Sequence, residues 1–140
     1  MAGRVRSAKK VDLIARVPLF AGLSKSELAK VASIADEIDL PEDKVLMREG
    51  ERGREFYVLL EGEAEVTRDG RTLATRRSGE FFGEIALVSS LPRIATVTTR
   101  TPVRALVIRD VEFRGLLQRT PAIALKVLTA VAERLPPDVG

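Results

Sequence analysis

The chain has 140 residues, of which 45% are hydrophobic and 31% charged, so it is long enough for one globular domain with its own core. It contains neither histidine nor cysteine, which excludes disulfides, Cys/His zinc sites, iron–sulfur clusters and His-based catalytic triads. The net charge is only +3. No apolar run approaches the roughly 18 residues of a transmembrane helix, and no signal-peptide core is present, so we expect a cytoplasmic protein without a membrane segment.

The first elements in chain order are a basic arm and a short helix. Cations crowd the first ten residues, which predicts a flexible arm over residues 1–12 and one domain over 13–140. A short apolar segment over 13–17 ends before Pro18. Ser24 and Glu27 have the spacing of a capping box. Apolar residues at helical spacing then predict a helix over 25–35.

Short strands fill the middle of the chain. They are predicted over residues 37–40, 44–48, 55–60, 63–68, 71–76, 94–100 and 102–109, with glycine or proline between most of them. Asp69-Gly70 is the strongest hairpin signal. Short strands at this spacing favour an antiparallel β-barrel or jelly roll over a parallel α/β sheet.

Helical periodicity returns after residue 110. Asp110 is expected to cap one helix, and Thr120-Pro121 provides an N-cap and a first-turn proline for a second. The apolar positions of the second helix are broader than one stripe, so part of it should pack on more than the barrel. Pro136-Pro137 is predicted to end it. The fold class is therefore α+β, an antiparallel barrel or jelly roll flanked by N- and C-terminal helices.

The cassette segment, residues 79–97, interrupts the strands. It predicts a short helix from Glu84 to about Ser89, entered through Gly83, whose unpaired N–H groups would attract an anion. Arg93 can fold back and offer a guanidinium fork to two oxygens of one phosphate. Glu84 can accept from a hydroxyl group. This pair suits a ligand with a phosphate and a hydroxyl a few ångströms apart, as in a ribose phosphate.

Two runs in this segment resemble a known family. Residues 82–87, Phe-Gly-Glu-Ile-Ala-Leu, and 92–97, Pro-Arg-Ile-Ala-Thr-Val, are similar to the phosphate-binding cassette of the cyclic nucleotide-binding domain family. That family includes catabolite-activator regulators, protein kinase A regulatory subunits and cyclic nucleotide-gated channels. The resemblance extends over about residues 13–135, where turn glycines and strand apolar residues also match. It implies a cassette helix inserted between strands of a barrel.

The resemblance also implies the ligand contacts. Arg93 would bind the exocyclic oxygens of the cyclic phosphate, and Glu84 the ribose 2′-hydroxyl. Backbone N–H groups near Gly83 and Ile94 would complete the phosphate site. Val66 and Leu73 match positions beside the base, and Arg134 is the first candidate for a lid residue, ahead of Thr129. The candidate ligand-binding residues are Gly83, Glu84, Ile85, Ala86, Arg93, Ile94, Ala95, Val66, Leu73 and Arg134.

The position after Arg93 bears on the choice of ligand. Family members selective for cGMP tend to carry Thr or Ser there, where a hydroxyl reaches the guanine amino group, whereas this chain has Ile94. The resemblance therefore implies cAMP as the main ligand and weaker binding of cGMP. Neither a metal nor another cofactor is expected.

The expected function is a sensor without catalytic residues. Ligand binding would redock the C-terminal helices and pass the signal to an effector protein or to a covalently attached effector domain. The alternatives are a sensing fragment of a cAMP-responsive transcription regulator or ion channel, and a degenerate domain that acts only as an interaction scaffold. A cupin-type barrel enzyme is disfavoured because such enzymes hold a metal through histidines. No DNA-reading helix-turn-helix follows the last helix, so we expect no nucleic-acid contact from this chain.

Overall fold

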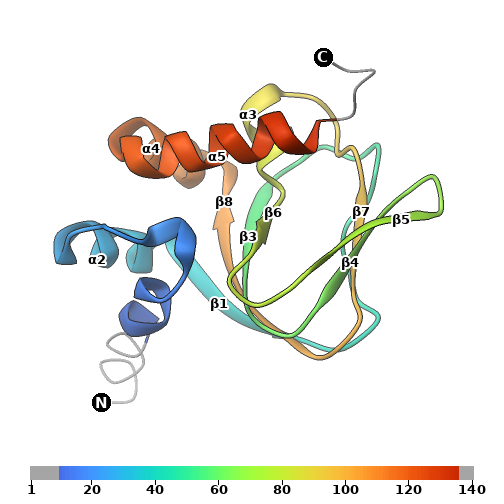
Figure 1. The fold of residues 1–140 in the computed structure, drawn as a ribbon, viewed down its shortest axis with the longest axis horizontal. Helices are drawn as coiled ribbons and strands as arrows, with labels where there is room; N and C mark the ends of the chain where they lie inside the picture. The colour runs from blue at the N-terminus through green and yellow to red at the C-terminus, as the bar shows by residue number, and fades with distance from the viewer. Residues whose placement is uncertain (1–9, 136–140) are drawn as a thin grey trace.

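The computed structural model describes residues 10–135, so most of the predicted basic arm and the Pro136-Pro137 stop lie outside the described residues. A helical segment over residues 10–15 comes first, and therefore the last three residues of the predicted arm are helical. The N-terminal helices are followed by a β-sandwich and two C-terminal helices (Figure 1). The elements are η1 (Pro18–Phe20), α2 (Lys25–Ile34), β1 (Ala35–Leu40), β2 (Val45–Met47), β3 (Glu55–Glu61), β4 (Ala64–Arg68), β5 (Arg71–Arg76), β6 (Phe81–Phe82), α3 (Glu84–Ser89), β7 (Thr96–Thr99), β8 (Val103–Arg109), α4 (Asp110–Arg119) and α5 (Pro121–Arg134).

The strands form two four-stranded sheets. The central sheet has the order β1-β8-β3-β6, and the second, which we call the cavity sheet, has the order β2-β7-β4-β5. Every pair is antiparallel. The antiparallel α+β architecture predicted from the strand spacing is therefore confirmed.

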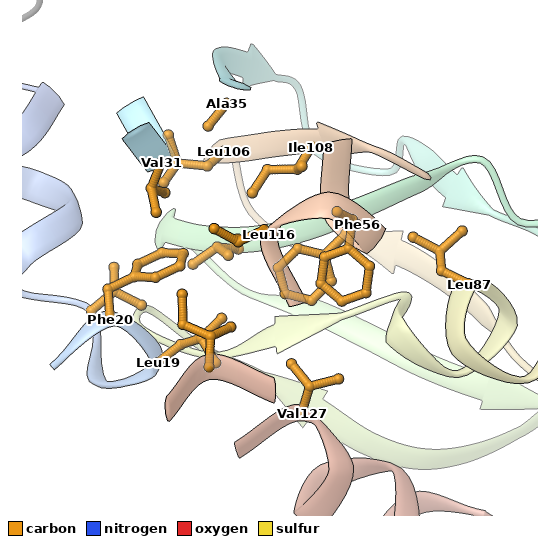
Figure 2. Close-up of a cluster of buried hydrophobic side chains, with 14 of the residues drawn as sticks. Leu19, Phe20, Val31, Ala35, Phe56, Leu87, Leu106, Ile108, Leu116 and Val127 are labelled. Atoms are coloured by element: carbon orange, nitrogen blue, oxygen red, sulfur yellow. The ribbon is translucent and has the colours of Figure 1, made fainter. Parts of the chain in front are cut away.

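Strand β3 of the central sheet is buried on both faces, which explains why it lacks a clean alternation of polar and apolar residues. Phe56 and Val58 point to the helices, whereas Tyr57 and Leu59 point into the space between the two sheets. Figure 2 shows the helix-side cluster, in which Phe56 lies among side chains from the helices and from β8. The rings of Phe56 and Phe113 stack with centroids 4.3 Å apart. The sandwich is thereby attached to the C-terminal helices through its central sheet.

Most predicted elements agree with the structure to within two residues. The capping box is present, with both Ser24–Glu27 hydrogen bonds formed, and Asp69-Gly70 joins β4 to β5 with positive φ at both residues. Asp110 is not an N-cap as predicted: it is the first residue of α4, and its carboxylate accepts from the N–H of Val111 at 2.8 Å. Thr120 occupies the N-cap position of α5, but its side chain makes no capping bond.

The last helix, α5, packs on η1, α3 and α4 rather than on the barrel alone, as its broad apolar surface predicted. Figure 1 shows it crossing the molecule beside α3. Lys126 donates from Nζ to the carbonyl oxygen of Pro18 at 2.8 Å and so ties α5 to η1. Leu125 and Leu128 remain exposed.

Candidate functional site

One cavity of about 260 Å³ lies between the cavity sheet, the cassette segment and the end of α5. All ten residues predicted from the sequence line its wall, and Thr129, the second lid candidate, does not. The lining residues are Met47, Val66, Leu73, Ala74, Arg76, Phe82, Gly83, Glu84, Ile85, Ala86, Arg93, Ile94, Ala95, Val97, Glu133 and Arg134. Whether the ten predicted residues bind a ligand stays a prediction, but the fold does bring them together.

The short helix of this site, α3, begins after a glycine that the geometry requires. Gly83 has φ 94°, in the left-handed region that side chains rarely adopt. A Cβ at this position would lie 2.9 Å from the carbonyl oxygen of Glu55 and 3.1 Å from Nη1 of Arg93. The glycine therefore allows both the turn into α3 and the close approach of Arg93.

Arg93 is buried, with 4% of its surface exposed. Its Nη1 donates to the carbonyl oxygen of Gly83 at 2.9 Å and its Nη2 to that of Glu55 at 2.7 Å. Backbone bonds to Gly50 and Glu51 hold the same residue against the loop between β2 and β3. Burial is the main influence on its guanidinium and lowers its pKa, although an arginine remains charged at neutral pH. The result is a fixed cation in the wall of the cavity.

Glu84 is the most deeply buried charged group of the cavity, with 1% of its surface exposed. Its Oε1 accepts from Nη1 of Arg134 at 2.7 Å, and the same nitrogen also donates to the carbonyl oxygen of Phe81 at 2.8 Å. The Arg134 guanidinium lies 4.6 Å from the centre of the Phe81 ring. Burial raises the pKa of Glu84, and the charge of Arg134 opposes that rise. The predicted lid residue is thus bonded to the predicted hydroxyl acceptor, which links α5 to α3.

The remaining lining is mostly apolar. Val66 is buried, whereas Leu73 at the rim is 57% exposed. Ile94 and Ala95 continue the wall directly after Arg93. The cavity thus joins an arginine and a carboxylate to an apolar compartment, a combination that can hold a molecule with an anionic group, a hydroxyl group and a flat apolar part.

Sequence reasoning missed some residues of this site. Gly53 was not singled out, yet a Cβ there would lie 2.6 Å from the Cβ of Ala86, so the β2–β3 loop needs a glycine where it meets α3. Arg76 also lines the cavity. It is the last residue of a strand that the sequence did predict, two positions after Ala74, and strand alternation could have placed both on one face.

The described part of the chain offers neither a cluster of metal ligands nor a membrane-spanning helix. Within residues 10–135 no group of three or more acidic side chains is placed to hold a metal ion. No helix in that part of the chain is long and apolar enough to cross a membrane.

Comparisons with known proteins agree with this geometry. A cyclic nucleotide-gated potassium channel of Rhizobium etli is 34% identical over 123 residues, which cover 88% of this chain and 34% of that protein. The cAMP-dependent protein kinase regulatory subunit of Yarrowia lipolytica is 37% identical over 103 residues, or 72% of this chain and 28% of that protein. The chain therefore spans about a third or less of these curated relatives.

The fold likewise matches solved structures. That of cAMP bound PfPKA-R superposes with a TM-score of 0.77 at 26% identity, covering 91% of this chain and 49% of that one. The family model described as "Cyclic nucleotide-binding domain" matches residues 37–120, more than half of the sequence and the whole cassette segment. The chain belongs to the cyclic nucleotide-binding domain family.

Proposed function

We propose that this domain binds cAMP in the cavity and acts as a sensor without catalysis of its own. The observation that carries the proposal is that Arg93 and Glu84 are both buried in the wall of one cavity whose other lining is largely apolar. An arginine suits a phosphate, a carboxylate suits a ribose hydroxyl, and apolar side chains suit a purine.

Both charged groups keep bonding capacity for such a ligand. A guanidinium has five N–H donors, and the bonds of Arg93 to Gly83 and Glu55 use two of them. The remaining donors can bind phosphate oxygens. Glu84 bonds Arg134 through Oε1, which leaves Oε2 to accept from a 2′-hydroxyl. Both residues therefore keep hydrogen-bonding capacity beyond the bonds they make within the chain.

The output would pass through the C-terminal helices. Leu87 of α3 belongs to the same buried cluster as Phe113, Leu116 and Val127 of α4 and α5, and Figure 2 shows these helices meeting at the central sheet. Arg114 of α4 donates from Nε to the carbonyl oxygen of Leu87 at 3.2 Å. A ligand that orders α3 would bias the docking of α4 and α5. The protein that receives this signal would be a separate effector protein or an effector domain attached to this chain. The cytoplasmic location expected from the sequence stays a prediction.

The preference for cAMP follows from Ile94. This residue has no side-chain hydroxyl to accept from the guanine amino group, so the cGMP-specific contact expected for Thr or Ser is lost. We therefore expect cAMP to bind more tightly than cGMP.

Titration calorimetry with cAMP tests the proposal. Arg93→Ala should lower the affinity at least ~100-fold, because a charge-assisted hydrogen bond contributes about 1.5–3 kcal/mol and Arg93 would make more than one. Arg104→Ala is the matched control: Arg104 is bonded to Asp39 on the exposed edge of the central sheet and should leave binding unchanged.

Two outcomes would contradict the proposal. If the wild-type protein gives no binding heat at a large excess of cAMP and cGMP, the domain is a scaffold. If Arg93→Ala binds as well as the wild type, the ligand does not use the cassette.

A further inference from the structure

Glu49, in the loop between β2 and β3, reaches the turn of the β4–β5 hairpin. Its carboxylate accepts a shared hydrogen bond from the backbone N–H of Asp69, with Oε1 and Oε2 at 3.3 and 3.2 Å. The hydroxyl of Thr96 in β7 donates to Oε1 at 3.4 Å and accepts from the N–H of Glu49 at 3.1 Å. Glu49 is not among the residues that line the cavity, so any effect it has on a ligand must pass through its neighbours.

The hairpin depends on Glu49 because its turn extends beyond the sheet. Strand β4 pairs with β7 only as far as Thr67, opposite Thr96, and β5 is an edge strand that pairs with β4 alone. Figure 1 shows the turn between β4 and β5 projecting from the side of the sandwich. In the described part of the chain, residues 10–135, the only side-chain hydrogen bonds to residues 68–71 are those of Glu49. Glu49 therefore fixes the free end of the hairpin.

The backbone that follows Glu49 holds the cassette segment. The N–H of Gly50 donates to the carbonyl oxygen of Arg93 at 2.8 Å, and the N–H of Arg93 donates to the carbonyl oxygen of Glu51 at 2.7 Å. A groove of about 420 Å³ lies between the hairpin turn and residues 91–94, and Glu49 lines it. The loop thus bridges this groove, with a side chain bonded to the hairpin and a backbone bonded to Arg93.

This bridge connects two parts of the cavity wall. Leu73 and Ala74 of β5 form one part, and Arg93 belongs to the other. A ligand that fills the cavity contacts both parts at once, and a wall that must be ordered during binding lowers the affinity. We propose that Glu49 is a positioning residue, which holds the β5 wall against the Arg93 segment and so pre-organises the cavity. The proposal rests on the proposed function, since its effect is measured as cyclic nucleotide affinity.

Calorimetry with cAMP on the wild type and two Glu49 variants tests this inference. Glu49→Ala removes the bonds to the hairpin turn and should weaken cAMP about fivefold to tenfold, because the ligand must then order the hairpin itself. Glu49→Gln keeps a side-chain oxygen that can accept from the N–H of Asp69. Since a neutral acceptor bonds more weakly than a charged one, we expect Glu49→Gln to retain the wild-type affinity to within about threefold.

Glu27→Ala is the matched control. The Glu27 carboxylate also accepts from a backbone N–H, that of Ser24 at 2.9 Å, but it does so at the start of α2 and does not line the cavity. Its loss should lower the free energy of unfolding through the capping box and leave the cAMP affinity unchanged. Urea denaturation of both alanine variants without ligand then separates a loss of stability from a loss of affinity.

A double-mutant cycle with Leu73→Ala tests the route of the effect. Leu73→Ala shortens a side chain of the β5 wall and should itself weaken cAMP. If Glu49 acts by holding that wall, part of its effect is lost once Leu73 is shortened. The combined loss of affinity should then be smaller than the product of the two single losses by about threefold.

The results separate this inference from the proposed function. Unchanged cAMP affinity in Glu49→Ala would overturn the inference, and so would an equal loss in Glu49→Gln, because the charge rather than the bond to Asp69 would then matter. Losses that simply multiply, or a Leu73→Ala variant that binds like the wild type, would show that Glu49 does not act through β5. In each of these cases cAMP binding by the wild type leaves the proposed function standing. If the wild type binds neither cAMP nor cGMP, the proposed function fails and the inference falls with it.

Discussion

At the scale of single residues, the ion pair between Glu84 and Arg134 has a double consequence. The carboxylate is almost fully buried, so its charge costs free energy unless Arg134 remains bonded to it. The same carboxylate is the proposed acceptor for a ribose hydroxyl. Stability and ligand binding therefore depend on the charge state of one side chain, which makes both sensitive to pH.

Comparing the wild type with Glu84→Gln should expose this pH dependence. Burial raises the pKa of Glu84 above its ordinary value of 4.5, so the folded state holds this proton more tightly than the unfolded state. The free energy of unfolding of the wild type should thus fall, relative to Glu84→Gln, as the pH rises from 4.5 through the raised pKa. Urea denaturation over about pH 4.5 to 7.5 measures the difference.

Arg134→Met sharpens the test. The charge of Arg134 lowers the pKa of Glu84, and its removal should extend the loss of stability to higher pH. A wild-type minus Glu84→Gln difference that stays flat, or increases with pH, would contradict the assignment.

How far the sequence predicts individual residues depends on how local their environment is. Arg93 and Glu84 lie nine positions apart in one motif, so the pattern indicated both. Gly53 and Arg76 acquire their surroundings from residues far along the chain: a Cβ at Gly53 would meet Ala86 and Arg93, and Arg76 lines the cavity together with Glu84 and Arg134. Strand alternation can place Arg76 on the cavity face, but no sequence pattern shows which distant residues surround Gly53 or Arg76.

At the scale of elements, the entry into α3 is the most constrained turn of the site. Several glycines of this chain have positive φ, including Gly22 at 84° and Gly83 at 94°. A Cβ at Gly22 would meet nothing within 4 Å, whereas one at Gly83 would press on the Glu55 carbonyl and the Arg93 guanidinium. An added side chain would strain the backbone at both positions but would displace Arg93 only at Gly83. Comparing substitutions at the two glycines therefore distinguishes these two effects.

Substituting each glycine by alanine tests this distinction. Gly22→Ala should cost about 1–2 kcal/mol of stability, the penalty for a side chain in the left-handed region, with unchanged cAMP affinity. Gly83→Ala should cost more and also weaken cAMP binding about tenfold or more, because Arg93 must move. Denaturation and calorimetry on both variants provide the measurements. Equal effects of the two substitutions on affinity would show that the α3 entry does not position Arg93.

Helices, strands and turns whose defining contacts are between neighbours in sequence could be predicted, whereas those that depend on distant residues could not. The capping box of α2 and the Asp69-Gly70 turn involve neighbours in sequence, and both formed as predicted. By contrast, β6 is only two residues long and exists because Phe81 and Phe82 pair with β3. Ala35 was expected to end a helix and instead begins β1, where it pairs with Ile108 of β8. In both cases a distant partner outweighed the local pattern.

At the scale of the whole molecule, the central sheet separates two buried clusters. The helix-side cluster contains Phe56 and Phe113, and the cluster between the sheets contains Tyr57 and Phe82. Tyr57 stacks on Phe82, whose side chain lines the cavity, with ring centroids 5.0 Å apart. Phe56 and Tyr57 are adjacent in β3 yet face opposite clusters, so the strand connects the ligand side with the helix side.

A double-mutant cycle tests this division. Phe56→Leu and Phe113→Leu should be non-additive by about 0.5–1.5 kcal/mol in the free energy of unfolding, because each removes one member of a stacked aromatic pair. Tyr57→Phe with Phe113→Leu is the control pair across the sheet and should be additive to within about 0.5 kcal/mol. Urea denaturation of the single and double variants gives both couplings. Strong coupling across the sheet with none between the stacked rings would contradict the two-cluster description.

The burial of β3 on both faces also affects how the protein is made. Five apolar residues in succession, 56–60, depend on β8 for pairing, and residues 62–102 must be translated before β8 begins. At about 5–20 residues per second this takes roughly 2–8 s. During that interval the nascent chain carries an unpaired, aggregation-prone segment. Glu55 and Glu61 flank this segment and occupy the positions at which charged gatekeeper residues oppose association of apolar strands.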